Sequence, residues 1–138
     1  MIDPLEAAIK VLMRRAELSA LAGRIANKHR YNDAWTTAQA GLVVVLDDSD
    51  PDWYVPKLSV RLEMQCFGAD DAAAMDTWMR LVEISRTLSR EAVLTSQGEA
   101  LVYSFLPESG PSYLPDPELP MLSRVLSFWR VQVSENKL

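Results

Sequence analysis

The segment Lys57-Leu58-Ser59-Val60-Arg61-Leu62-Glu63-Met64-Gln65-Cys66 alternates apolar and polar side chains without a break. Successive side chains of a β-strand point to opposite faces of a sheet, so this period of two predicts a strand with one buried face and one wet face. Apolar segments rich in β-branched residues or alternating in polarity occur at 42–46, 100–106 and 123–133, and they predict further strands. We therefore expect a sheet of about four strands, antiparallel or mixed.

Two amphipathic helices are predicted beside this sheet. Asp3 suits an N-cap before the first helix, and Gly68–Asp71 ends the alternating strand and caps a second helix. Apolar residues recur in both helices with a period near 3.6, which is typical of helices packed on a sheet. The expected fold is α+β with both helices on one face, and Trp78, Leu62 and Val131 are expected to share the core.

Length and charge limit the classes of function. The 138 residues, 49% of them hydrophobic, suit a single domain over 1–138. A formal net charge of −5 argues against a surface that grips the phosphate backbone, although DNA can pass close to an acidic wall. The short basic and aromatic group Lys28–Tyr31 does not outweigh this balance. The sequence shows neither a signal peptide nor an apolar run long enough to span a bilayer, so we expect no membrane association.

No catalytic constellation is recognisable in the sequence. The sole histidine, His29, has no nucleophile or acid at an interpretable spacing, and the sole cysteine, Cys66, falls on the apolar face of the alternating strand. We therefore expect neither an enzyme nor a cofactor-binding protein.

A proline-rich segment separates the last two predicted strands. Five of the eight prolines lie between Pro107 and Pro120. Because proline lacks the amide donor and restricts its predecessor, we expect 107–120 to be an extended arm or an ordered loop and neither helix nor sheet. An interface with another subunit is predicted for residues of this arm and of the last strand: Pro111, Tyr113, Leu114, Pro115, Asp116, Pro117, Leu126 and Phe128. The alternative is an intramolecular loop that covers one edge of the sheet.

An acidic segment follows the strand at 42–46. It contains Asp47, Asp48, Asp50 and Asp52 beside Pro51, and repulsion between the carboxylates predicts an exposed turn. The segment lacks the glycine and the distal glutamate of a calcium loop, so we expect no metal there. It either lines a channel for DNA or is a solvated loop with no such role.

The order of predicted elements resembles that of the tail terminator, or tail completion, proteins of long-tailed bacteriophages. The resemblance rests on a helix that begins Pro4-Leu5-Glu6, on the strand Leu58 to Phe67 with its acidic turn and Ala-rich helix, and on Leu114 to Glu118 before an aromatic and valine strand. It implies a structural virion protein of the tail or neck, assembled in the host cytoplasm. Such a protein forms a ring, expected to be a hexamer, that caps the tail tube and ends its polymerisation.

The same resemblance implies the partners: further copies of the chain, the tail tube protein and a head-completion or neck protein, with DNA passing through unbound. Two alternatives remain open. One is another head-to-tail joining ring, such as a stopper or a connector adaptor, and the other is a generic adaptor domain outside any phage.

Overall fold

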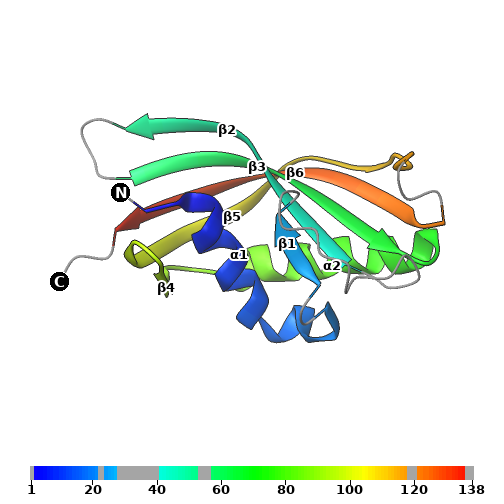
Figure 1. The fold of residues 1–138 in the computed structure, drawn as a ribbon, viewed down its shortest axis with the longest axis horizontal. Coiled ribbons are helices and arrows are strands. Elements are labelled where there is room, and N and C mark those ends of the chain that lie inside the picture. Colours follow the sequence, from blue (N-terminus) through cyan, green and yellow to red (C-terminus); the bar gives the residue numbers. More distant parts are fainter. Residues whose placement is uncertain (1, 22–23, 28–40, 53–56, 118–120, 136–138) are drawn as a thin grey trace.

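The computed structural model describes residues 2–21, 24–27, 41–52, 57–117 and 121–135 (Figure 1). The elements within these residues are α1 (Pro4–Arg14), the 3-10 helix η1 (Ala16–Leu21), β1 (Ile25–Asn27), β2 (Gly41–Asp52), β3 (Lys57–Gly68), α2 (Asp71–Thr87), β4 (Glu91–Thr95), β5 (Gly98–Tyr113) and β6 (Ser123–Glu135). The six strands form one mixed sheet in the order β1-β2-β3-β6-β5-β4, in which β1 and β2 run parallel and the other pairs antiparallel. The α+β class is confirmed, and the sheet is wider than the predicted four strands.

The helices begin where the sequence predicts. An Asp3 carboxylate oxygen accepts a hydrogen bond from the Leu5 N–H at 2.9 Å, and an Asp70 carboxylate oxygen accepts one from the Ala73 N–H at 2.8 Å. Each bond satisfies an amide that the first turn of a helix leaves free. Figure 1 shows α1 and α2 on the same side of the sheet.

The main core lies between the helices and the sheet. The inward positions of β3 are fully buried, as its alternation predicts: Val60, Leu62, Met64 and Cys66. They share one cluster with buried residues of both α-helices. Trp129 of β6 stacks on Phe105 of β5 with 4.5 Å between ring centroids, and its indole N–H donates to the Ser127 hydroxyl at 2.9 Å. A polar group that would otherwise be stranded in the core is thereby satisfied.

The expected core position of Trp78 is only partly right. Leu62 and Val131 are buried in the core, whereas Trp78 is half-buried and packs against the edge of the core cluster. The buried face of α2 is instead formed by Ala74, Thr77, Leu81 and Ile84. Thr77 thus faces the sheet, whereas the larger Trp78, which was expected there, lies beside it.

The prediction that 107–120 cannot be sheet is wrong for its first half. Residues 107–113 belong to β5, which pairs with β6 as far as Tyr113 and Val125. Beyond Val102, β4 no longer pairs with β5, so this half of β5 is an edge strand. Proline is tolerated on an edge because the missing N–H leaves no partner unsatisfied there. Residues 118–120 of the predicted arm lie outside the described residues.

The predicted acidic turn is also part of a strand. β2 runs through to Asp52, with Asp48 opposite Arg61, Asp50 opposite Ser59 and Asp52 opposite Lys57. An irregularity in the register between Leu46 and Asp48 coincides with the start of the acidic stretch. Pairing along the whole of β3 outweighs the low strand propensity of aspartate and proline, since propensity is weak beside cross-strand pairing.

Helix α1 covers the edge strand β4 with a polar stripe. Glu6, Lys10 and Arg14 are spaced four residues apart and so lie on one face of the helix. Glu6 accepts hydrogen bonds from the Ser96 N–H at 2.9 Å and from its hydroxyl at 2.8 Å, Lys10 donates to the Leu94 carbonyl, and Arg14 pairs with Glu91 at 3.1 Å. Glu6 thus links the first turn of α1 to the β4–β5 turn.

Candidate assembly surface

The connection between β5 and β6 carries three exposed apolar side chains. Tyr113 ends β5 and is 52% exposed, Leu114 follows it at 49%, and Met121 precedes β6 at 77%. This connection, here called the hairpin tip (residues 113–117 and 121–122), lies at the right-hand end of the sheet in Figure 1. Large apolar side chains in solvent at one end of an ordered sheet are characteristic of a contact surface.

Arg124 fastens the hairpin tip to the sheet. Its Nε donates to the Leu114 carbonyl at 2.7 Å, and the Leu114 N–H donates in return to the Arg124 carbonyl at 3.1 Å. Its Nη1 lies 3.4 Å from Gln65 Oε1 on β3 and 3.7 Å from an Asp116 carboxylate oxygen. One guanidinium thus joins three segments, and its planar set of donors suits such multiple contacts.

A small apolar cluster holds the other side of the hairpin tip. Leu122 is 5% exposed and packs with Val43 of β2 and Phe67 of β3, with Val45 against them. These residues lie on the face of the sheet opposite α1 and α2, which we call the open face. The two ends of the hairpin tip are therefore both attached to the sheet, one through Arg124 and the other through Leu122.

A close approach of two strands lies beneath the hairpin tip. Gly110 has a φ of +96°, in the left-handed region that favours glycine. A Cβ atom at this position would lie 2.8 Å from the Leu126 carbonyl oxygen and 3.0 Å from the Ser127 Cα. Backbone atoms cannot move aside as a flexible side chain can, so residue 110 must be glycine for β5 to reach β6 here.

The open face carries a row of paired charges. Arg61 of β3 stands over the Phe128 ring of β6, with 4.1 Å from its guanidinium carbon to the ring centroid. It pairs with Asp47 at 2.9 Å and lies 3.7 Å from Glu108, and Glu108 pairs with Arg130 at 3.2 Å. These side chains are about one third exposed, so each pair contributes little to stability. Their charges are nonetheless matched within the chain.

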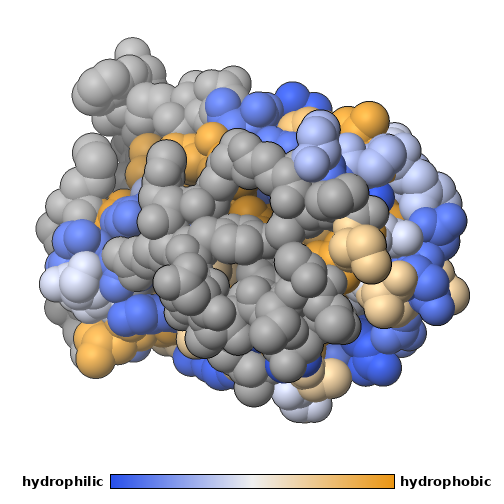
Figure 2. Space-filling view, turned by 45° about the vertical axis from the view of Figure 1, so that its right-hand side comes forward, coloured by the Kyte–Doolittle hydropathy of each residue, from blue (hydrophilic) through white to orange (hydrophobic). Residues whose placement is uncertain are grey.

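The predicted interface residues lie along one side of the molecule. Pro111, Tyr113, Leu114, Pro115 and Pro117 are exposed, and Asp116 is half-buried against Arg124. Leu126 and Phe128 are half-buried on the open face, Leu126 opposite Ser112 and Phe128 opposite Ser109. The structure thus brings the predicted residues of the proline-rich segment and of β6 together. Figure 2, which turns this end of the sheet toward the reader, shows apolar and hydrophilic surfaces interspersed.

The predicted acidic residues are placed only in part. Asp47 is exposed and holds Arg61. Asp48, Asp50 and Asp52 lie in β2, but their side chains are outside the described residues. Across the described residues, no three His, Cys, Asp or Glu side chains are grouped closely enough to hold a metal ion.

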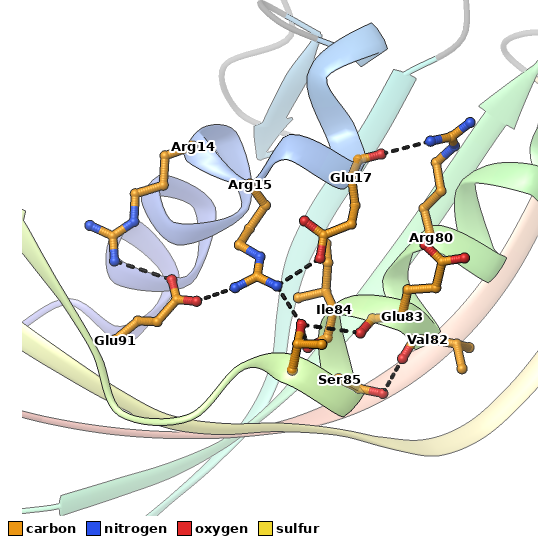
Figure 3. A network of polar contacts seen from close by, with 10 residues as sticks. Arg14, Arg15, Glu17, Arg80, Val82, Glu83, Ile84, Ser85 and Glu91 are labelled. Carbon is orange, nitrogen blue, oxygen red and sulfur yellow. Dashed lines mark hydrogen bonds and ion pairs between the residues drawn. The ribbon is translucent and has the colours of Figure 1, made fainter.

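A polar cluster that the sequence did not predict joins α1 to α2 and β4 (Figure 3). The Arg15 guanidinium donates to Glu17 at 2.7 Å, to Thr87 at the end of α2 and to Glu91 at the start of β4. The hydrogen bond from Arg15 lowers the pKa of Glu17 below its usual value, and the same bond raises the pKa of the Arg15 guanidinium. Arg15 and Glu91 lie 76 positions apart in the chain, so no local pattern indicates their contact.

Cys66 and a small cavity are two further features of the described residues. Burial raises the pKa of the Cys66 thiol, so it stays protonated in the core. A cavity of about 10 Å³ between α1 and the sheet is lined by Ala8, Leu88 and Phe105 among others, and it is too small for a substrate. His29 and the group Lys28–Tyr31 lie outside the described residues.

Neither α1 nor α2 is both long and apolar enough to cross a bilayer, and the same holds for η1, the other helix of the described chain. No protein-family model matches the chain, and no curated protein matches it significantly.

Proposed function

We propose that this chain is a tail terminator protein of a long-tailed bacteriophage. Six copies form a ring that caps the tail tube, ends its polymerisation and provides the surface that joins the tail to the head or neck. The observation that carries the proposal is the hairpin tip, where Tyr113, Leu114 and Met121 are exposed on a segment that Arg124 fastens to the sheet. The resemblance of the sequence to tail terminator proteins also supports it, since the helix that begins at Pro4 and the strand β3 followed by the Ala-rich helix α2 are both present.

The hairpin tip suits a contact between subunits because the backbone of Leu114 is held to Arg124 by two hydrogen bonds. A segment whose backbone is already held loses less conformational freedom on association than an unattached arm does. Aromatic and large aliphatic anchors account for much of the binding energy at protein interfaces. Tyr113 and Leu114 are the proposed anchors, and Pro111, Pro115, Asp116 and Pro117 complete the edge of the contact.

The open face supports a second part of the interface. Leu126 and Phe128 are half-buried there, beside the ion pairs of Arg61 with Asp47 and of Arg130 with Glu108. Charges that are already paired cost less to cover with another protein than single ions do. The surface of one subunit can therefore receive a different surface of the next, which is the head-to-tail arrangement that closes into a ring.

The charge of the chain suits a ring through which DNA passes. A formal net charge of −5 leaves little attraction for phosphate. In the proposed ring, the acidic part of β2 from Asp47 to Asp52 faces the channel or the solvent and binds no metal.

The test is to image tail tubes assembled with and without this protein. The chain is co-expressed with a tail tube protein from the same genome, and the tubes are examined by electron microscopy. We expect a ring at one end of each tube and a narrower distribution of tube lengths. Leu114→Ser should abolish the ring, whereas Met13→Ser should not, because Met13 is 51% exposed on α1, away from the hairpin tip.

Two results would contradict the proposal. The first is tubes of unrestricted length with no protein at their ends. The second is binding to the head-side connector in place of the tube, which would identify a stopper or connector adaptor.

A further inference from the structure

One edge of the sheet is open beyond the reach of β4. β4 pairs with β5 only as far as Val102, and the Arg90 N–H donates to the next carbonyl, that of Tyr103, at 3.4 Å. In the part of the chain that the structure describes, no further strand pairs with the Ser104–Tyr113 stretch of β5 on the side away from β6. Such an edge offers unpaired backbone groups to a strand of another molecule.

This stretch, which we call the β5 edge (Ser104–Tyr113), is unusually irregular. Its register with β6 shifts between Val102 and Ser104, between Pro107 and Ser109, and again between Ser109 and Ser112. Pro107 and Pro111 supply no amide hydrogens, and prolines within sheets occupy edge positions where the N–H would face solvent. An added strand needs an evenly spaced row of donors and acceptors, and the β5 edge does not present one.

The neighbouring edge strand is closed in another way. Lys10 of α1 donates a hydrogen bond to the Leu94 carbonyl of β4, and Glu6 accepts one from the N–H of Ser96 in the following turn. Helix cover and bulged, proline-bearing strands are both recognised means of blocking strand addition. Both β4 and the β5 edge thus carry features that block an added strand.

We propose that the prolines of the β5 edge block strand-to-strand association between copies of this chain. Copies then meet through side chains, as at the hairpin tip, and not through one sheet that continues from molecule to molecule. Edge pairing has no built-in limit, because each added molecule presents a new edge, whereas a ring is complete once it closes. The proposal concerns the isolated chain and holds whether or not the chain acts in a phage tail.

The opposite side of the sheet has a similar composition. β1 pairs with β2 only from Leu42 to Val44, and the rest of β2 contains Asp47, Asp48, Asp50, Asp52 and Pro51. Charged residues and prolines on edge strands both discourage pairing, since like charges would face one another across the new contact. The two segments that stand out most in the sequence thus share one physical role in the sheet.

The test compares two substitutions at Pro107. Pro107→Thr restores the amide and adds a residue that favours strands, so it opens the β5 edge. Pro107→Lys restores the same amide but adds a charge that itself discourages pairing. Pro4→Thr is the matched control, because Pro4 is the first residue of α1 and lies outside the sheet and the hairpin tip. Sedimentation velocity over a range of concentrations measures association, and hydrogen exchange of residues 104–113 locates it.

We expect Pro107→Thr to form species that grow with concentration beyond any closed ring, with new amide protection in residues 104–113. Pro107→Lys and Pro4→Thr should retain the distribution of the unsubstituted chain. The proposal is wrong if Pro107→Thr sediments like the unsubstituted chain, or if Pro107→Lys associates as strongly as Pro107→Thr. Thermal unfolding of all the variants shows whether each is folded. If Pro107→Thr is unfolded and associates without new amide protection at residues 104–113, the proposal is also wrong.

Discussion

Gly110 is the residue on which the path of β5 beneath the hairpin tip depends. Its φ of +96° is strained for any residue with a side chain, and the space that a Cβ would need is filled by the backbone of β6. We predict that Gly110→Ala lowers the free energy of unfolding by about 2–4 kcal/mol, of which the φ accounts for about 1–2. Urea unfolding monitored by tryptophan fluorescence measures the change.

Gly98 provides a matched control for the steric part of this cost. It also has a positive φ, of +127°, but a Cβ there would meet only the Ile2 Cδ1 atom at 3.8 Å. Gly98→Ala should therefore destabilise the protein through its backbone conformation alone, and by less than Gly110→Ala. Equal losses for the two variants would mean that the contact with β6 does not constrain residue 110.

Residue patterns predicted the helix starts, the buried face of β3 and only part of the buried face of α2. Asp3 and Asp70 act through amides only a few positions away, so their role is visible locally. The burial of Thr77 and the partial exposure of Trp78 depend on how α2 lies against the sheet. The 3.6-residue period fixes a stripe of neighbours but not which of two adjacent stripes turns inward.

At the scale of elements, the sequence patterns predicted the central strands correctly but not the stretches at the edges of the sheet. Both corrected segments, 47–52 and 107–113, are edge stretches where a strand neighbour lies on one side only among the described residues. Aspartate and proline are poor residues for a central strand and acceptable ones for an edge. The short strands β1 and β4 carry too few residues to show a period, and the sequence did not reveal them.

The sequence predicted which residues form the candidate surface, but it did not predict which contacts support them. Tyr113 and Leu114 are exposed, yet their support by Arg124 depends on Gln65, which is 59 positions away. Such contacts follow from the register of β3 with β6, where Gln65 lies opposite Leu126. No pattern within a single strand contains that register.

The cluster around Arg15 should make stability depend on pH. Because folding lowers the pKa of Glu17, the unfolded chain takes up a proton at a higher pH than the folded chain does. The contribution of this carboxylate is therefore fully present above the ordinary glutamate pKa of about 4.3. That contribution is lost as the pH falls through the lowered pKa of Glu17 in the folded chain.

We predict that Glu17→Gln destabilises the protein at pH 7 by about 1 kcal/mol, and that its difference from the unsubstituted chain shrinks as the pH falls below about 4. Thermal or urea unfolding of both chains between pH 7 and pH 3 measures this difference. Glu83→Gln, at an exposed position on α2, is the control and should show a smaller effect. A difference that stays constant over this range would show that the Glu17 carboxylate does not supply the stabilisation.

At the scale of the whole molecule, the two faces of the sheet differ in composition and in their proposed roles. The face toward α1 and α2 holds the main core, and the open face holds matched charges around Phe128 and the base of the hairpin tip. In the proposed ring, the first face maintains the subunit, while the open face and the hairpin tip make contacts between subunits. The net charge of −5 keeps such a ring from gripping the DNA that passes through it.

The most direct test of this account is the mass of the assembled particle. Native mass spectrometry of the purified chain, alone and with tail tubes present, should detect a particle of six times the 15.5 kDa chain mass. The same measurement on Leu114→Ser should detect the folded single chain. A particle that remains a single chain at every concentration, with and without tubes, would contradict the proposed ring.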